Sequence, residues 1–135
     1  MERILGRYSV YVYAILRIVV GFLFLLHGTQ KLLGYPPAPT GGELSTLFLA
    51  GGVIEIVTGF LVMIGFFSSV AAFIASGEMA VAYFMFHQPR ASLPTANAGD
   101  AAVLFCFIFL YIASRGSGPW SVDSLVRNPT PVADV

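Results

Sequence analysis

Apolar residues dominate four long segments of the chain, and Gly, Pro and polar residues gather in the stretches between them. The apolar segments cover about residues 11–33, 44–65, 69–86 and 98–114. A helix rises about 1.5 Å per residue, so crossing the hydrocarbon core of a bilayer takes roughly 20 residues. The pattern therefore predicts four transmembrane helices, of which the fourth is near the minimum length.

The composition agrees with this pattern. Hydrophobic residues make up 57% of the chain and charged residues only 10%, whereas a soluble domain averages about 25% charged residues. The formal net charge of zero gives no reason to expect a nucleic-acid partner. We expect an all-α, four-helix transmembrane bundle in contact with the lipid bilayer, formed by residues 1–135 as a single domain.

Basic residues outside the apolar segments indicate the orientation. The arginines on the side of the two chain ends are Arg3, Arg7, Arg115 and Arg127. The loops on the other side carry only Lys31, at a helix end, and Arg90. The positive-inside rule therefore predicts that both termini are cytoplasmic, in a multi-pass protein of the cell membrane.

The second and third apolar segments are separated by only a few residues, which predicts a tight helical hairpin. We expect Gly65 to cap the end of one helix, and Ser68 or Ser69 to cap the start of the next. Residues 115–135 are polar and contain proline, so we expect a cytoplasmic tail, with Trp120 near the membrane interface.

Ionisable residues inside the apolar segments are the first candidates for function. They are Arg17, His27, Glu55 and Glu78. A charge at membrane depth is disfavoured by about 2.5–3.5 kcal/mol on insertion scales, so it usually faces a partner or a wet cavity. At about 100° per residue, Arg17 and Lys31 share one stripe of the first helix, with His27 at its edge. Small residues flank both glutamates, which favours close helix approach and inward-facing carboxylates.

These positions predict a buried polar network of Arg17, Glu55 and Glu78, with His27 and Lys31 as further ligand candidates. Two interpretations are open at this point, and they can coexist. The network can fix the register of the helices, or it can handle a ligand, a quinone or protons.

A quinone site needs an apolar groove, an aromatic ring and a group that hydrogen-bonds a carbonyl. Tyr83 and Phe86 are candidates to line such a groove, close to His27 and Lys31. The alternative is that the aromatic rings face lipid or core, and that Lys31 extends toward lipid headgroups.

Other cofactor chemistry has little support in the sequence. The single cysteine, Cys106, excludes an internal disulfide and fits a packing role. No glycine fingerprint for a nucleotide is present. His27 and His87 are the only histidines, so we expect no metal site and no covalently bound cofactor.

Several separated motifs resemble the DoxX family of small bacterial and archaeal membrane proteins. They are RIVVGFLFLLHGTQKL at 17–32, GGVIEIVTG at 51–59, GFFSSVAA at 65–72, GEMA at 77–80 and GPWSVD at 118–123. The resemblance covers about residues 15–123. The positions that carry over from the family are Arg17, Gly28, Lys31, Glu55, Gly59, Gly65, Glu78 and Asp123.

The resemblance implies a four-helix protein of the cell membrane. It also implies a link to subunits of thiosulfate:quinone oxidoreductase and to redox or thiol-stress systems. Where relatives often carry a Glu at the start of the fourth helix, this chain has Asp100. Asp100 also fits a capping position with Asn97 as the N-cap, which is a structural role.

Three functions follow as hypotheses. The first is a membrane subunit of a redox system, which binds quinone or works with a sulfur-oxidising or thiol-oxidising partner that carries the cofactor. Such a subunit would not be catalytic alone. The second is a structural or assembly subunit, and the third is a small-molecule carrier. Small-residue stripes favour a partner subunit or a homo-oligomer.

Overall fold

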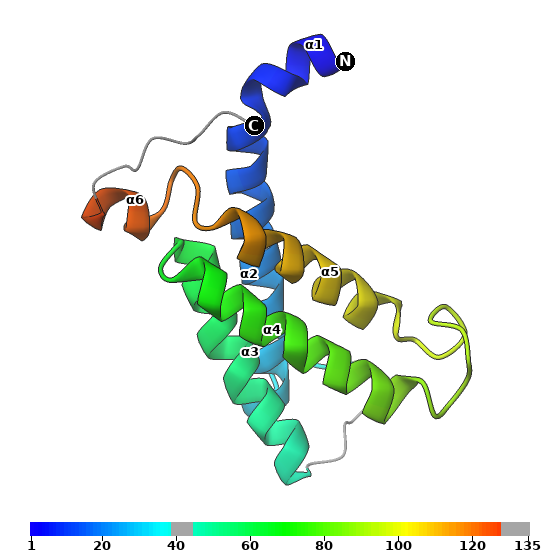
Figure 1. Ribbon diagram of the computed structural model, residues 1–135. Helices are drawn as coiled ribbons and strands as arrows, with labels where there is room; N and C mark the ends of the chain where they lie inside the picture. The colour runs from blue at the N-terminus through cyan, green and yellow to red at the C-terminus, as the bar shows by residue number, and fades with distance from the viewer. Residues whose placement is uncertain (39–44, 128–135) are drawn as a thin grey trace.

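The computed structural model describes residues 1–38 and 45–127, and these residues form helices and no strands. The elements in chain order are α1 (Glu2–Leu5), η1 (Gly6–Tyr8), α2 (Ser9–Leu33), α3 (Thr46–Ile64), α4 (Ser68–Ala82), η2 (Tyr83–His87), α5 (Asp100–Arg115) and α6 (Val122–Val126). The η2 segment is a π-helical continuation of α4. The predicted all-α class is therefore confirmed (Figure 1).

Three helical stretches are long and apolar enough to cross a membrane. They are Glu2–Leu33, Thr46–Ile64 and Ser68–His87. The fourth long helix, α5, has 16 residues, which is just below the usual lower limit of about 17 for a transmembrane helix. The predicted segments and the observed helices agree to within a few residues, but the predicted start of the second at residue 44 lies outside the described residues.

The helix ends follow from local capping. Ser45 precedes α3, and its hydroxyl oxygen accepts a hydrogen bond from the Phe48 N–H at 3.2 Å. Gly65 ends α3 with a φ of +75°, as the sequence predicts. The predicted serine cap of α4 is wrong, because Phe67 holds the N-cap position. Its N–H donates to a carboxylate oxygen of Asp123 at 3.0 Å.

The start of α5 also differs from the prediction. Gly99 is the N-cap, and Asp100 is the first helical residue. Asn97 lies outside the helix, where its side-chain oxygen accepts a hydrogen bond from the Gly99 N–H at 2.9 Å. Asn97 thus fixes the turn before α5 instead of capping the helix, and Asp100 lies exposed in the first turn.

The four long helices pack in chain order, α2 on α3, α3 on α4 and α4 on α5 (Figure 1). Aromatic side chains complete the bundle between α2 and α5. The fully buried Phe24 ring of α2 contacts the rings of Phe105 and Phe109, with centroids 5.3 and 4.6 Å apart. The bundle therefore encloses one core, in which α2 and α5 meet through bulky side chains.

Glycines bring α2 and α3 into backbone contact. A Cβ added to Gly21 would lie 2.6 Å from the Met63 nitrogen, and one added to Gly28 would lie 2.7 Å from the Gly52 carbonyl oxygen. A Cβ on Gly59 would meet the Gly21 carbonyl oxygen at 2.9 Å. Such close packing supplies the dispersion energy that holds helices together in lipid.

The C-terminal segment folds back onto the bundle. Residues 122–126 form the short helix α6, and the Asp123 N–H donates to the Gly65 carbonyl at 3.0 Å. Trp120 is exposed, and its ring lies against Tyr11 at the start of α2, with centroids 5.4 Å apart. The segment before residue 128 is thus attached to the α3–α4 turn, and residues 128–135 lie outside the described residues.

The glycine contact predicts a large cost for one methyl group. We expect Gly28→Ala to destabilise the protein by about 1–3 kcal/mol, because its Cβ would overlap the backbone of α3. Gly77→Ala is the matched control, since a Cβ at Gly77 meets nothing within 4 Å. Unfolding of both variants in detergent checks this prediction, and equal stability would contradict it.

Candidate functional site

An ion pair joins the end of α2 to the middle of α3. The Lys31 ammonium nitrogen lies 2.7 Å from Oε1 of Glu55. Glu55 is 2% exposed, and the Lys31 side chain is 21% exposed. The aliphatic stem of Lys31 runs past Gly52, where an added Cβ would lie 3.1 Å from the Lys31 Cβ. The glycine packing of α2 on α3 thus brings the ammonium group to the buried carboxylate.

A third ionisable group, Glu78, reaches the same place from α4. A Cβ placed on Gly51 would lie 3.1 Å from Oε1 of Glu78 and 3.8 Å from the Lys31 nitrogen. Glu78 and Lys31 therefore flank one point on the surface of α3, and the absence of a side chain at Gly51 lets the Glu78 carboxylate approach this point. We call Lys31, Glu55 and Glu78 the ion cluster.

The ion cluster holds more acceptors than its own residues satisfy. Two buried carboxylate oxygens, Oε2 of Glu55 and Oε2 of Glu78, have no hydrogen-bond partner among the described residues. One ammonium stands against two carboxyl groups, so the fully ionised cluster carries a net negative charge. Buried acceptors without partners cost free energy, and a ligand that donates hydrogen bonds would remove that cost.

An aromatic ring borders the ion cluster. The Lys31 nitrogen lies 5.1 Å from the centre of the Phe48 ring, which is within range of a cation–π contact. Phe48 was not among the candidate residues predicted from the sequence. Its position seven residues before Glu55, or about two helical turns on the same face of α3, is the signal that could have identified it.

The structure places Arg17 outside the ion cluster, at the opposite end of the bundle. The fully buried guanidinium donates hydrogen bonds to the carbonyl oxygens of Val62 at 2.7 Å and Met63 at 3.0 Å. It also donates to those of Pro119 at 3.3 Å and Trp120 at 2.7 Å. The expected network of Arg17 with the two glutamates is thus replaced by one in which Lys31 is the base.

This position of Arg17 has a structural consequence. The last carbonyl groups of α3 have no partners within the helix, so they can accept hydrogen bonds from a side chain. A cation at this end also interacts favourably with the negative end of the helix dipole. A Cβ on Gly65 would lie 2.6 Å from an Arg17 nitrogen, so this glycine leaves the space that the guanidinium fills. Arg17 therefore fastens the C-terminal segment to the α3–α4 turn.

His27 is exposed on the surface of α2 instead of buried in the network. Its ring meets the Phe105 ring edge-on, with centroids 5.6 Å apart. His27 lies one helical turn before Lys31, so it is near the ion cluster along α2 without belonging to it.

The predicted groove residues lie elsewhere. The Tyr83 ring stacks on His87, with centroids 6.4 Å apart, and its hydroxyl oxygen lies 3.5 Å from the Asn97 side-chain nitrogen. Phe86 is exposed. Both residues belong to the π-helical segment η2, and no contact of either with the ion cluster is found among the described residues.

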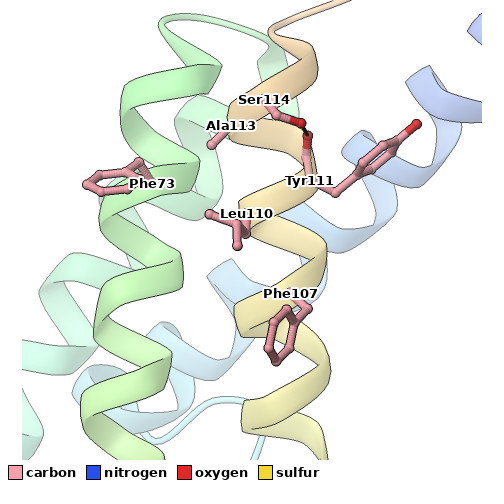
Figure 2. A pocket seen from close by; sticks show the side chains of 6 residues that line it. All are labelled: Phe73, Phe107, Leu110, Tyr111, Ala113 and Ser114. Carbon is pink, nitrogen blue, oxygen red and sulfur yellow. Dashed lines mark hydrogen bonds between the residues drawn. The ribbon is translucent and has the colours of Figure 1, made fainter.

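Two apolar hollows lie on the outer surface of the bundle. Figure 2 shows the first, between α4 and α5, lined by Phe73, Phe107, Leu110, Tyr111, Ala113 and Ser114. The second lies between the start of α2 and Tyr111. Neither includes a residue of the ion cluster, and both expose mainly apolar side chains, as expected for surfaces that face lipid.

The remaining chemical candidates have structural contacts. The Ser76 hydroxyl donates to the Cys106 carbonyl at 2.8 Å, and its oxygen lies 3.6 Å from the Cys106 sulfur. Cys106 thus packs between α4 and α5. Within residues 1–38 and 45–127, no group of three or more His, Cys, Asp or Glu side chains is placed to hold a metal ion.

The fold and the ion cluster define a small helical membrane protein with buried charges between its helices. Comparison with known proteins gives the family. Residues 12–88, which are more than half of the chain, match the DoxX family. The chain belongs to this family.

A relative from Haemophilus influenzae, described as an uncharacterized protein, is 43% identical over 126 residues. The match covers 89% of this chain and 94% of the relative. No solved structure matches the chain.

The hydrogen bonds of Arg17 predict a loss of stability when it is replaced by lysine, which keeps the charge. We expect Arg17→Lys to lower the free energy of unfolding by about 2 kcal/mol, because an ammonium cannot reproduce the four carbonyl contacts of the guanidinium. Unfolding in detergent and protease cleavage between residues 115 and 121 measure the effect. Arg7→Lys, at an exposed arginine, is the control. Unchanged stability of Arg17→Lys would contradict the assignment.

The ion pair predicts coupling between its two partners. Lys31→Met leaves the Glu55 carboxylate without its hydrogen bond, so we expect a destabilisation of about 1–3 kcal/mol. The double variant Lys31→Met, Glu55→Met removes both charges and should lose less stability than the two single variants together. A double-mutant cycle of unfolding free energies tests this, and simple additivity would show that the pair contributes nothing.

Proposed function

We propose that this DoxX protein is an integral membrane subunit of a redox system and that its ion cluster binds the head group of a quinone. The observation that supports this is that two buried carboxylate oxygens of the ion cluster, Oε2 of Glu55 and Oε2 of Glu78, have no hydrogen-bond partner among the described residues. Ionisable residues at membrane depth usually mark sites of ligand or proton handling. A quinone resides in the same bilayer as the protein.

The proposal includes the topology. Four transmembrane helices, with α5 as the fourth, place both termini in the cytoplasm of a cell-membrane protein. The arginine distribution supports this orientation. The contact of Asp123 with Gly65 agrees with it, because it holds α6 at the α3–α4 turn. Lys31, near the other end of α2, then lies in the outer half of the membrane.

The groups of the ion cluster fit the chemistry of a quinone. The Lys31 ammonium has N–H groups left to donate to a carbonyl oxygen, and the Phe48 ring borders the same space. Reduction of a quinone to a quinol takes two electrons and two protons. In this proposal Glu55 and Glu78 are carboxylates that take up protons from water and pass them to the reduced ligand.

The electrons come from a protein partner that carries the cofactor. The likeness to subunits of thiosulfate:quinone oxidoreductase favours a partner that oxidises sulfur compounds or thiols. The charge of the ion cluster agrees with this division of work. Two carboxylates near one ammonium repel a sulfur oxyanion, so an anionic substrate would bind to the partner and the neutral quinone to this chain.

A structural or assembly subunit is the second candidate. The observation that favours it is that Lys31–Glu55 crosses the α2–α3 interface, while Arg17 fastens the other end of α3. Both contacts would stabilise the bundle without any ligand. The two functions predict different results when a carboxylate is replaced by its neutral amide.

We expect Glu78→Gln to lower quinone turnover about 100-fold while the complex still assembles, because a carboxyl group that relays protons is lost and the helix shape is kept. The test is affinity isolation in mild detergent followed by quinone reduction with the electron donor of the complex. Asp100→Asn, at an exposed carboxylate far from the ion cluster in sequence, is the control. Normal turnover in Glu78→Gln, or loss of assembly alone, would support the structural function instead.

A further inference from the structure

We propose that the ion cluster binds the reduced, hydroxyl-bearing form of its ligand, a quinol, more tightly than the corresponding quinone. This inference rests on the proposed function and specifies the chemical form that the same site selects. The observation behind it is the imbalance between hydrogen-bond donors and acceptors in the ion cluster.

The imbalance can be followed atom by atom. Glu55 uses one carboxylate oxygen to accept from Lys31, and its other oxygen has no partner among the described residues. Glu78 contributes another buried oxygen in the same condition. The only donor group of the cluster is the Lys31 ammonium, which has three N–H groups, one of them directed to Glu55.

The quinone and the quinol differ in the hydrogen bonds that they can form with the ion cluster. A quinone carbonyl only accepts hydrogen bonds, so it can use Lys31 but leaves both carboxylate oxygens without partners. A quinol hydroxyl accepts from Lys31 and also donates its proton to a carboxylate oxygen. Hydrogen bonds to a charged group are about twice as strong as neutral ones. A site built to pair with a hydroxyl discriminates against the analogue that lacks it.

The burial of Glu55 increases the difference in affinity between the quinone and the quinol. Glu55 is 2% exposed, so water gives little compensation for an acceptor that the ligand leaves unpaired. A Cβ added to Gly51 would lie 3.1 Å from Oε1 of Glu78 and 3.8 Å from the Lys31 nitrogen, so these two groups are close neighbours. A ligand hydroxyl placed between these two groups would hydrogen-bond to both.

Preference for the quinol has a redox consequence. Tighter binding of the reduced form raises the midpoint potential of the bound couple, in which one quinone, two electrons and two protons give one quinol. Electrons from the partner that carries the cofactor then flow toward the bound quinone. The ion cluster is thereby suited to quinone reduction.

The test compares both redox forms on one preparation. The purified full chain in lipid nanodiscs is equilibrated without oxygen with a short-chain benzoquinone or with its quinol, and binding is measured by equilibrium dialysis. We expect the quinol to bind at least about tenfold more tightly, which corresponds to one additional charge-assisted hydrogen bond. Glu78→Gln and Glu55→Gln should bring the two affinities close together, because each replaces a charged acceptor by a neutral amide. Asp100→Asn should keep the preference.

Each other outcome decides a separate point. If neither form binds, the proposed function fails. If both forms bind the wild-type chain equally, quinone binding stands and the preference is refuted. If the preference survives in both amide variants, it arises outside the ion cluster and the inference fails. Glu55→Gln also removes the ion pair, so Glu78→Gln decides the question if Glu55→Gln does not fold.

Discussion

Placing charge inside a hydrocarbon layer is the constraint on which the structure depends. Lys31 and Glu55 satisfy it by pairing across the α2–α3 interface. The pair forms only because glycines allow the two backbones to touch, which carries the lysine stem past Gly52 to the buried carboxylate. The ion pair therefore depends on helix packing. The small residues set the distance between the helices, and the charges define which residues face each other.

The buried charges at the two ends of the α2–α3 interface have different kinds of partners. Arg17 donates hydrogen bonds to four backbone carbonyl groups at the end of α3 and in the loop before α6, and these bonds hold the C-terminal segment, while its Nε has no partner among the described residues. The ion cluster instead retains buried acceptors beyond those that Lys31 satisfies. We therefore locate the proposed ligand chemistry at the Lys31 end of the bundle and assign a structural role to the Arg17 end.

Much of the fold was predictable, because long apolar segments define helices and helical periodicity defines faces. The stripe of small residues around Glu55 correctly indicated an inward carboxylate. The partner of each charge was not predictable. Backbone carbonyls such as that of Val62 leave no signature in the sequence, and the stagger of α2 against α3 selects Lys31 over Arg17. The same limit applies to Phe67, whose capping role depends on Asp123, 56 residues away.

The most direct test of this account is a distance measurement in lipid. Solid-state NMR on protein labelled with 15N in lysine and 13C in glutamate reports dipolar coupling between the Lys31 ammonium nitrogen and the Glu55 carboxyl carbon. The account predicts strong coupling, as the nitrogen–oxygen distance of 2.7 Å requires, and its loss in Glu55→Gln. Absence of this coupling in the wild-type protein, with Arg17 coupled to a glutamate carboxyl carbon in an arginine-labelled sample, would contradict it.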